Sequence, residues 1–280
     1  MKIDVSVVIP TYNRPEELIR SLKTVFNQTY DGNIEVLIID DSKKSQEKFI
    51  DEKFHKILKN SKNRYIKYIY KGKKEGSPRA RNIGIKEARG EFIAFLDDDD
   101  EWLPDKIKKQ VKVMKKFKDV GLVICYSIDK RFGRERISKP SETITHDTIL
   151  KSFNLSSSST YLVRKNAIEK TDGFDVTLPS AQEYDLAIRL SQNYKVRCVP
   201  KVLMIQNMTE GQISENWNRK IKGLLAIYHK HGKEYSSISF IDYIINNIKF
   251  IGVLGLFFLG YIFGNRIYYI IIPAKKIYET

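Results

Sequence analysis

The first half of the chain alternates short apolar runs with amphipathic stretches, and this alternation constrains the fold more than any other feature. Val5–Pro10 is an apolar run that ends at a proline, as expected for a strand buried on both faces. Pro15–Thr29 then carries Leu18, Leu22 and Val25 at helical spacing. Such alternation indicates right-handed crossovers and a mostly parallel central sheet flanked by helices, which is an α/β fold.

The alternation continues to residue 126 and then becomes less regular. Further strands are expected at Glu35–Ile39, Ile66–Tyr70, Phe92–Leu96 and Leu122–Tyr126, with helices at Arg79–Ala88 and Asp105–Phe117. Beyond residue 130 we expect an irregular segment at Gly133–Thr145, a helix at Glu183–Gln192, strands flanking Pro200 and a helix from about Ser214 to His231.

The charge balance restricts the partners that the chain can have. It holds 49 Lys and Arg residues against 34 Asp and Glu, a net charge of +15. Such an excess suits nucleic acid, an anionic membrane surface or phosphorylated substrates. The basic residues are spread along the chain without a basic recognition helix or an aromatic RNA-binding motif, which disfavours nucleic acid. We therefore expect a membrane surface and a phosphate-bearing substrate.

The cysteines and the N-terminal residues indicate a cytoplasmic catalytic part. Cys125 and Cys198 lie far apart beside apolar neighbours, so we expect two buried thiols in a reducing compartment. Met1–Asp4 leads directly into a strand-like run and does not resemble a secretion signal. The histidines show no useful grouping, and we expect all four at the surface: His55, His146, His229 and His231.

The last part of the chain is apolar. Phe250–Gly264 is fifteen residues without a charge, Arg266 interrupts the run, and Ile267–Ile272 resumes it. Fifteen helical residues rise only about 22 Å, which is less than the roughly 30 Å of a bilayer core. With the extension the segment could span a membrane, it could lie on one, or it could pack on the protein. We expect residues 216–280 to form a helical, membrane-associating tail.

Carboxylates follow two of the expected strands. Asp97–Asp100 comes directly after Phe92–Leu96, and Asp40 and Asp41 end the strand at Glu35–Ile39. The carboxyl ends of strands in an open α/β sheet face the ligand crevice, where carboxylates can hold a divalent cation that bridges a diphosphate. An ionised Asp41 can also accept a hydrogen bond from a base or a ribose. The alternatives are a solvated acidic turn and a turn that caps a helix at Ser42.

Two further polar positions lie at the starts of expected helices. Arg81 precedes Gly84, and an arginine there can pair with phosphate or stack on a base, although a plain surface position is as common. Glu183 opens the helix at Glu183–Gln192. A carboxylate in a first helical turn is favoured by the helix dipole alone, and it can also serve as a general base for an incoming hydroxyl.

Together these segments resemble family 2 glycosyltransferases of the GT-A fold. The matching segments occur in the family's order: Val7–Arg14, Val36–Ser42, Arg81–Glu91, Phe95–Trp102 and Gln182–Leu186. The resemblance covers about the first 215 residues. It implies a GT-A domain at 1–215, with a nucleotide-sugar half at 1–103 and an acceptor half at 104–215, followed by the tail.

The resemblance also implies roles for single residues. Pro10, Thr11 and Tyr12 would shape the nucleotide pocket, Asp41 would take the base N–H, and Arg81 would lie against the nucleotide. Asp97 and Asp99 resemble the family's DxD pair and would hold Mg²⁺ or Mn²⁺, with Asp99 the principal ligand and Asp97 or Asp98 facing ribose and phosphate. Glu183 stands where the family usually has an aspartate base. No histidine precedes Gly211–Ser214, where family members often carry one.

The implied reaction is the inverting transfer of a sugar from a nucleotide diphosphate sugar, most simply a UDP-sugar, to a hydroxyl acceptor. Basic character and the apolar tail favour a polyprenyl-phosphate-linked acceptor at the cytoplasmic face of the cell membrane. Two alternatives remain at this point. A nucleotidyltransferase would share the sheet and the acidic site, although the first strand is followed by no glycine-rich, lysine-bearing loop. A non-catalytic nucleotide-sugar-binding module would not need Glu183.

Overall fold

The first four long strands form the parallel half of one sheet. The computed structural model describes residues 2–60, 63–131, 134–152, 155–208 and 216–263. In this half β2 (Ile34–Asp40) lies between β1 (Val5–Thr11) and β3 (Arg64–Tyr70), and β4 (Phe92–Phe95) pairs with the other side of β1. All three pairings are parallel, as the strand–helix alternation predicts.

The second half of the sheet is mixed. The long strands β6 (Val120–Arg131) and β10 (Lys195–Met208) pair in parallel, and the short β9 (Leu162–Arg164) joins them to β4 by antiparallel pairing. Three short antiparallel strands complete the edges: β5 (Glu101–Trp102), β7 (Arg134–Ser138) and β8 (Thr143–Ile144). The order along the sheet is β3-β2-β1-β4-β9-β6-β10-β5.

Two expectations for this half are wrong. Residues 133–145 were expected to be irregular, yet β7 and β8 lie there, β7 paired with the long strand β6 and β8 with the long strand β10. Strands were also expected on either side of Pro200, whereas β10 runs through it. The ladder to β6 shifts its register between Val199 and Val202, where the proline lacks an N–H to donate.

Helices cover both faces of the sheet and bury an apolar core on each. In β1, Val7 and Ile9 join the core on one face and Val8 joins the core on the other. The first core is covered by α1 (Pro15–Phe26), α2 (Glu47–Asn60) and α4 (Lys106–Lys116). The second is covered by α3 (Ser77–Glu87), α5 (His146–Leu150), α6 (Lys165–Glu169) and α7 (Gln182–Ser191).

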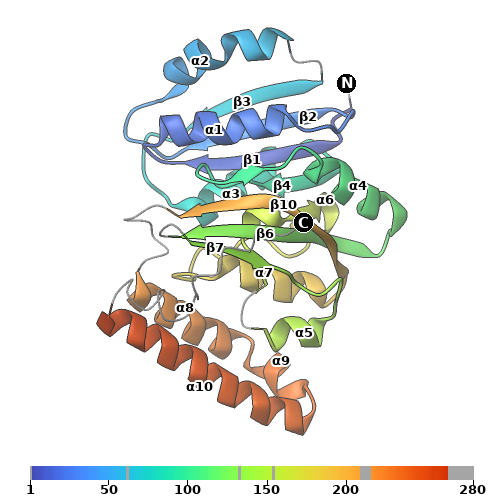
Figure 1. Ribbon diagram of the computed structural model, residues 1–280, viewed down its shortest axis with the longest axis vertical. Coiled ribbons are helices and arrows are strands. Elements are labelled where there is room, and N and C mark those ends of the chain that lie inside the picture. Colours follow the sequence, from blue (N-terminus) through green and yellow to red (C-terminus); the bar gives the residue numbers. More distant parts are fainter. Residues whose placement is uncertain (1, 61–62, 132–133, 153–154, 209–215, 264–280) are drawn as a thin grey trace.

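Three further helices form a layer at the end of the molecule opposite β3 (Figure 1). They are α8 (Trp217–Lys230), α9 (Gly232–Ser237) and α10 (Phe240–Phe263), and α8 and α10 lie side by side. Phe250 on α10 is buried, whereas Ile248 and Ile251 are 65% and 68% exposed. Residues 242–262 of α10 are long and apolar enough to cross a membrane by length and composition. The expected helix start at Ser214 and the apolar run after residue 263 lie outside the described residues.

Candidate active site

The carboxyl ends of β1, β2 and β4 open into one cavity of about 370 Å³, within the size range of small-ligand pockets. Seven residues that the sequence singles out line it: Pro10, Thr11, Tyr12, Asp41, Asp97, Asp98 and Asp99. The sheet therefore brings together two acidic segments that are distant in the sequence, since Asp41 and Asp97 are 56 residues apart. The remaining wall includes Arg14, Lys74 and Asn207, which the sequence alone did not single out.

The acidic run folds into a tight turn at the end of β4. The backbone N–H of Asp100 donates to the carbonyl of Asp97 across 3.0 Å, and Ser21 Oγ lies within 2.7 Å of the carbonyl oxygens of Asp98 and Asp100. Thr11 Oγ1 donates to Asp98 Oδ2 across 2.8 Å. These contacts fix the backbone of the turn, so its carboxylates are held at one wall of the cavity.

Arg14, in the cavity wall, pairs with two of these carboxylates. Its Nη1 lies 2.7 Å from Asp99 Oδ2 and 3.5 Å from Asp98 Oδ1. Arg14 stands two residues after Tyr12 in the first matching segment, a position from which a long side chain can reach back across the strand ends. This nearness to Tyr12 was the only sequence feature that could have pointed to Arg14, because the sequence does not determine the direction of a side chain after a strand.

Acidic side chains are crowded and buried at this turn, which raises the pKa values of Asp98, Asp99 and Asp100. Burial and the neighbouring Asp99 raise the pKa of Asp98 to about 7, and burial together with Asp97 raises the pKa of Asp99 to about 6. Burial also raises the pKa of Asp100 well above its usual value, and Asp100 Oδ2 is buried without a hydrogen-bond partner. Oxygen ligands of this kind fit a hard divalent cation, which would relieve their repulsion.

The protein would supply only part of such a coordination shell. Among the described residues, no three His, Cys, Asp or Glu side chains are grouped so that they alone hold a metal ion. A magnesium-like cation commonly takes one or two carboxylates and completes its shell with phosphate oxygens and water. Asp97 and Asp99 fit the first of these contributions.

Asp41 faces the cavity at the end of β2. Its Oδ2 accepts hydrogen bonds from the backbone N–H groups of Glu75 (3.1 Å) and Gly76 (2.8 Å), while its Oδ1 is buried with no partner. Burial raises the pKa of Asp41, which the two N–H donors partly oppose. The adjacent Asp40 instead accepts from the N–H of Ser42 and from the Tyr68 hydroxyl, so it is committed to the turn. Asp41 thus offers an unused acceptor to a ligand.

Arg81 lies behind the acidic turn and not in the cavity wall. It is 4% exposed, its Nη2 lies 2.5 Å from Asp97 Oδ1, and its Nη1 lies 3.5 Å from Glu183 Oε1. Arg81 reaches this position because its helix, α3, packs very closely on β1. A Cβ at Gly84 in α3 would lie 2.2 Å from Val8 Cγ1 in β1. Arg81 therefore links the acidic run to Glu183. Its connection to the cavity is the ion pair with Asp97, which lines the cavity wall.

Glu183 lies in the first turn of α7 and keeps 24% of its side chain exposed. It is partly accessible from solvent but is not among the residues that line the cavity. Asp185, two residues later, is fully buried, and both of its oxygens are occupied by Arg189, Lys230 and His231. Asp185 is therefore not a substitute base.

The expectation that all four histidines lie at the surface is wrong for His231. This residue is 2% exposed, and its Nε2 lies 2.8 Å from Asp185 Oδ1. His146 is half-buried and contacts Ser191 Oγ, His229 is exposed, and the side chain of His55 is outside the described part of the chain. The partner of His231 is 46 residues away, a distance at which no periodicity in the sequence links the two.

Known proteins match most of the chain. The profile of glycosyl transferase family 2 matches residues 6–175. The putative colanic acid biosynthesis glycosyl transferase WcaA of Escherichia coli K12 is 30% identical over 249 residues, which is 84% of each chain. WfaP of Escherichia coli, a UDP-Glc:alpha-D-GlcNAc-diphosphoundecaprenol beta-1,3-glucosyltransferase, is 30% identical over 215 residues, 76% of this chain and 80% of its own.

Solved structures share the fold. Residues 1–349 of S. aureus TarS in complex with UDP-GlcNAc superpose with a TM-score of 0.63 and 19% identity, over 90% of this chain and 82% of the other. The mannosyltransferase PcManGT of Pyrobaculum calidifontis, in complex with GDP-Man and Mn²⁺, superposes with a TM-score of 0.64 and 16% identity. The match covers 83% of this chain and 65% of the other. The chain spans 62% of an uncharacterized Haemophilus influenzae glycosyltransferase and 49% of a longer TarS chain.

Proposed function

The chain belongs to glycosyl transferase family 2 and has its GT-A fold, and from that membership we propose that it transfers a sugar from a UDP-sugar to a hydroxyl acceptor with inversion. One observation carries the proposal. A single cavity combines an unused acceptor, Asp41 Oδ1, with the acidic turn Asp97–Asp100, as a nucleoside diphosphate with a cation requires. The 1–103 segment supplies both, in keeping with its proposed role as the nucleotide-sugar half.

The nucleotide end of the cavity suits uracil. The N3–H of uracil is a donor, and Asp41 Oδ1 is a buried acceptor without a partner. Tyr12 offers a ring at the same wall, with Lys74 Nζ 4.2 Å from its centroid, and Pro10 and Thr11 complete that side. The name of WfaP specifies a UDP-Glc donor for that relative, which supports the same base here.

The acidic turn suits a divalent cation, Mg²⁺ or Mn²⁺, held by Asp99 and Asp97. When bound, such a cation would neutralise charge that develops on the departing diphosphate. Asp98 faces the ribose and the phosphates from the same turn. Arg81 holds Asp97 from behind and so fixes the direction of that carboxylate toward the cavity.

Glu183 acts as the general base. The acceptor hydroxyl gives its proton to the carboxylate while its oxygen bonds to the anomeric carbon, and the bond from that carbon to the diphosphate breaks on the opposite face. A single displacement of this kind inverts the anomeric centre. The position of Glu183 in the 104–215 segment agrees with an acceptor half that approaches the donor across the acidic turn.

The acceptor is proposed to be linked to a polyprenyl phosphate at the cytoplasmic face of the cell membrane. WfaP is named for a diphosphoundecaprenol-linked acceptor, and Cys125 and Cys198 are both free and buried, as in a reducing compartment. In the proposed tail, residues 216–280, one side of α10 packs on α8 and the other exposes Ile248 and Ile251. A helix covered on one side and apolar on the other suits a position in the membrane interface.

The test is a reaction screen. The full chain is incubated with UDP-, GDP- and TDP-sugars and Mn²⁺ or Mg²⁺, and release of nucleoside diphosphate is measured with and without lipid-linked acceptors. Release of UDP that requires the cation is expected. A nucleotidyltransferase would instead form pyrophosphate from nucleoside triphosphates. A binding module would be stabilised by a nucleotide sugar without releasing product, and either of these results would contradict the proposal.

A further inference from the structure

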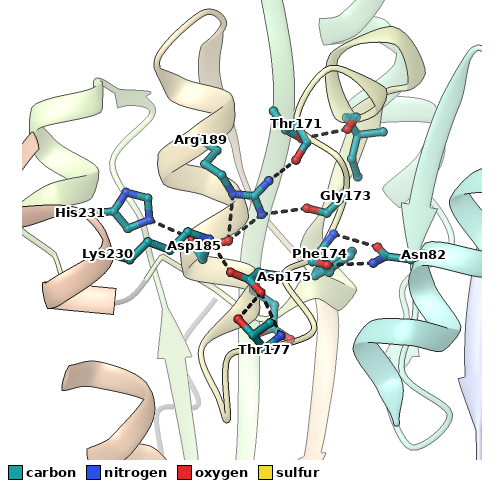
Figure 2. Close-up of polar contacts among 12 residues, drawn as sticks. Asn82, Thr171, Gly173, Phe174, Asp175, Thr177, Asp185, Arg189, Lys230 and His231 are labelled. Carbon is teal, nitrogen blue, oxygen red and sulfur yellow. Dashed lines mark hydrogen bonds and ion pairs between the residues drawn. The ribbon is translucent and has the colours of Figure 1, made fainter. Parts of the chain in front are cut away.

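Asp185 lies at the centre of a buried polar cluster outside the cavity, drawn in Figure 2. Its Oδ2 accepts from Arg189 Nε (2.9 Å) and Nη2 (2.6 Å), and its Oδ1 lies 2.8 Å from His231 Nε2 and 2.7 Å from Lys230 Nζ. Burial raises the pKa of Asp185, but the hydrogen bond from His231 and the charges of Arg189 and Lys230 together hold it well below the usual range. The carboxylate is therefore a permanent acceptor that joins α7 to the end of α8.

Arg189 extends the cluster into the loop that precedes α7. Its guanidinium donates to the carbonyl oxygens of Thr171 and Gly173, the second across 2.7 Å. Gly173 has a φ of +70°, and a Cβ there would lie 2.5 Å from Asn82 Oδ1. Asn82 in turn pairs with the backbone of Phe174 by two hydrogen bonds of 2.8 Å. The loop is thus clamped between Arg189 and the helix that carries Arg81.

The clamped loop supports Arg81 directly. The ring of Phe174 lies with its centroid 5.3 Å from Arg81 Cζ and packs edge-on against Phe95, 5.1 Å between centroids. Arg81 then holds Asp97 and Glu183. A continuous series of contacts therefore leads from Asp185 to the proposed base, in addition to the single turn of α7 that the two residues share.

Residues of the C-terminal helices contact the other side of Asp185 and the loop before α7. Lys230 also pairs with Asp175 Oδ2 at 2.6 Å, in the same loop, and His231 Nδ1 lies 3.2 Å from Glu234 on α9. Near its middle, α8 packs closely on Ser180, two residues before α7 begins: a Cβ at Gly223 would lie 2.0 Å from Ser180 Oγ. Through Lys230 and Gly223, α8 thus contacts both the loop and the segment that leads into the helix that presents Glu183.

We propose that Asp185 is a positioning residue through which α8 and α9 hold the Arg81–Glu183 pair in place for removal of the acceptor proton. In the described part of the chain its polar contacts include no residue of the cavity wall, so it is not a catalytic residue. This inference rests on the proposed function of Glu183. Its consequence is that the C-terminal layer sets kcat, while donor binding at Asp41 and Tyr12 is independent of it.

The test keeps Asp185 and substitutes two of the residues that donate hydrogen bonds to it. Lys230→Met and His231→Asn each remove one donor from Asp185, and Lys233→Met is the matched control because Lys233 is exposed on α9. We expect kcat to fall about tenfold in the first two variants, since small misplacement of a reacting group is costly, with an unchanged Kd for UDP. The control should match the wild type. A merely structural cluster would lower Tm and leave kcat per folded molecule unchanged.

Each variant is then combined with Glu183→Gln. If the cluster acts through Glu183, the added loss of kcat in that background should be less than about twofold, because interacting residues are non-additive. Wild-type kcat in both folded single variants would overturn the inference, as would a full tenfold further loss in the Glu183→Gln background. If Glu183→Gln alone keeps normal turnover, the proposed function itself fails. If Glu183→Gln is impaired while Lys230→Met and His231→Asn are not, only the positioning role fails.

Discussion

Glu183 Oε1 lies 3.5 Å from Arg81 Nη1, so the proposed base and the arginine that was expected at the nucleotide form one ion pair. The same guanidinium holds Asp97 at 2.5 Å. The proposed metal ligand Asp97 and the proposed base Glu183 therefore share one buried cation. The ion pair engages Oε1 of Glu183, while 24% of the side chain stays exposed.

The first prediction concerns the base itself. Glu183→Gln keeps the shape of the side chain but cannot accept a proton, so turnover should fall by roughly 10²–10⁴, the usual effect of removing a positioned acid–base group. Binding of UDP should be nearly unchanged, because Asp41 and the acidic turn are untouched. Glu183→Asp should recover part of the rate. Steady-state kinetics and UDP titration measure both effects, with Glu169→Gln, an exposed glutamate on α6, as the control.

A helix-dipole role for Glu183 gives a different outcome. The Gln substitution would then cost at most about 1 kcal/mol of unfolding free energy and leave turnover near the wild-type value. Normal turnover with a slightly lower Tm would remove Glu183 from the mechanism. The burial and full occupancy of Asp185 leave it unable to replace Glu183 as base.

The second prediction concerns base recognition by Asp41. In Asp41→Asn the amide oxygen can still accept from the N–H groups of Glu75 and Gly76, which places the NH₂ group where Oδ1 now lies. The NH₂ group and the N3–H of uracil, both hydrogen-bond donors, would then face each other. We expect the Kd for UDP to rise about 10- to 100-fold, the cost of losing a hydrogen bond to a charged acceptor.

CDP provides the internal control for this prediction, because N3 of cytosine is an acceptor. The wild type should prefer UDP to CDP, and Asp41→Asn should lose or reverse that preference. Competition titrations of the two nucleotides measure the ratio directly. An unchanged UDP:CDP ratio in a folded variant would show that Asp41 does not meet the base.

The meeting of Asp41 with Asp97 at one cavity could be predicted from the sequence for a simple physical reason. Both follow apolar runs, and the carboxyl ends of parallel strands lie at one edge of a sheet, so their side chains must converge whatever the details of packing. The strand–helix alternation likewise predicts the α/β fold, and the resemblance of the five matching segments implies its GT-A form; the comparisons confirm both.

The rest depends on contacts that local patterns do not encode. Arg81 is held by Asp97 and Glu183, and His231 by Asp185, each pair formed only when separate elements pack together. Strands such as β7 carry little apolar periodicity and form because a long strand beside them offers free backbone groups. These features require the assembled structure.

The third prediction concerns the cation. The carboxylates of Asp97–Asp100 would repel a bare diphosphate, so UDP should bind weakly in EDTA and substantially more tightly with Mn²⁺ or Mg²⁺. Asp99→Asn should remove most of that difference. Calorimetric titration of UDP with and without the cation measures it, and uridine, which lacks phosphates, is the control because its affinity should not respond to the metal. Equal UDP affinity in both conditions, or normal turnover in Asp99→Asn, would contradict the metal assignment.

The last prediction concerns the exposed side of α10. Ile248 and Ile251 are among its most exposed residues, so Ile248→Ser combined with Ile251→Ser should leave the fold and UDP binding intact. If these side chains enter a membrane interface, each contributes about 1.5–3 kcal/mol to binding, and the double variant should bind vesicles at least about 100-fold more weakly. Sedimentation with vesicles that contain anionic lipid measures the partition, and raised salt should weaken the wild type further because the chain carries a net charge of +15. The retained shift of Tm with UDP and Mn²⁺ reports that the catalytic domain is unaffected. A wild-type chain that stays in the supernatant with such vesicles, or a double variant that binds them equally well, would exclude this side of α10 as the membrane contact.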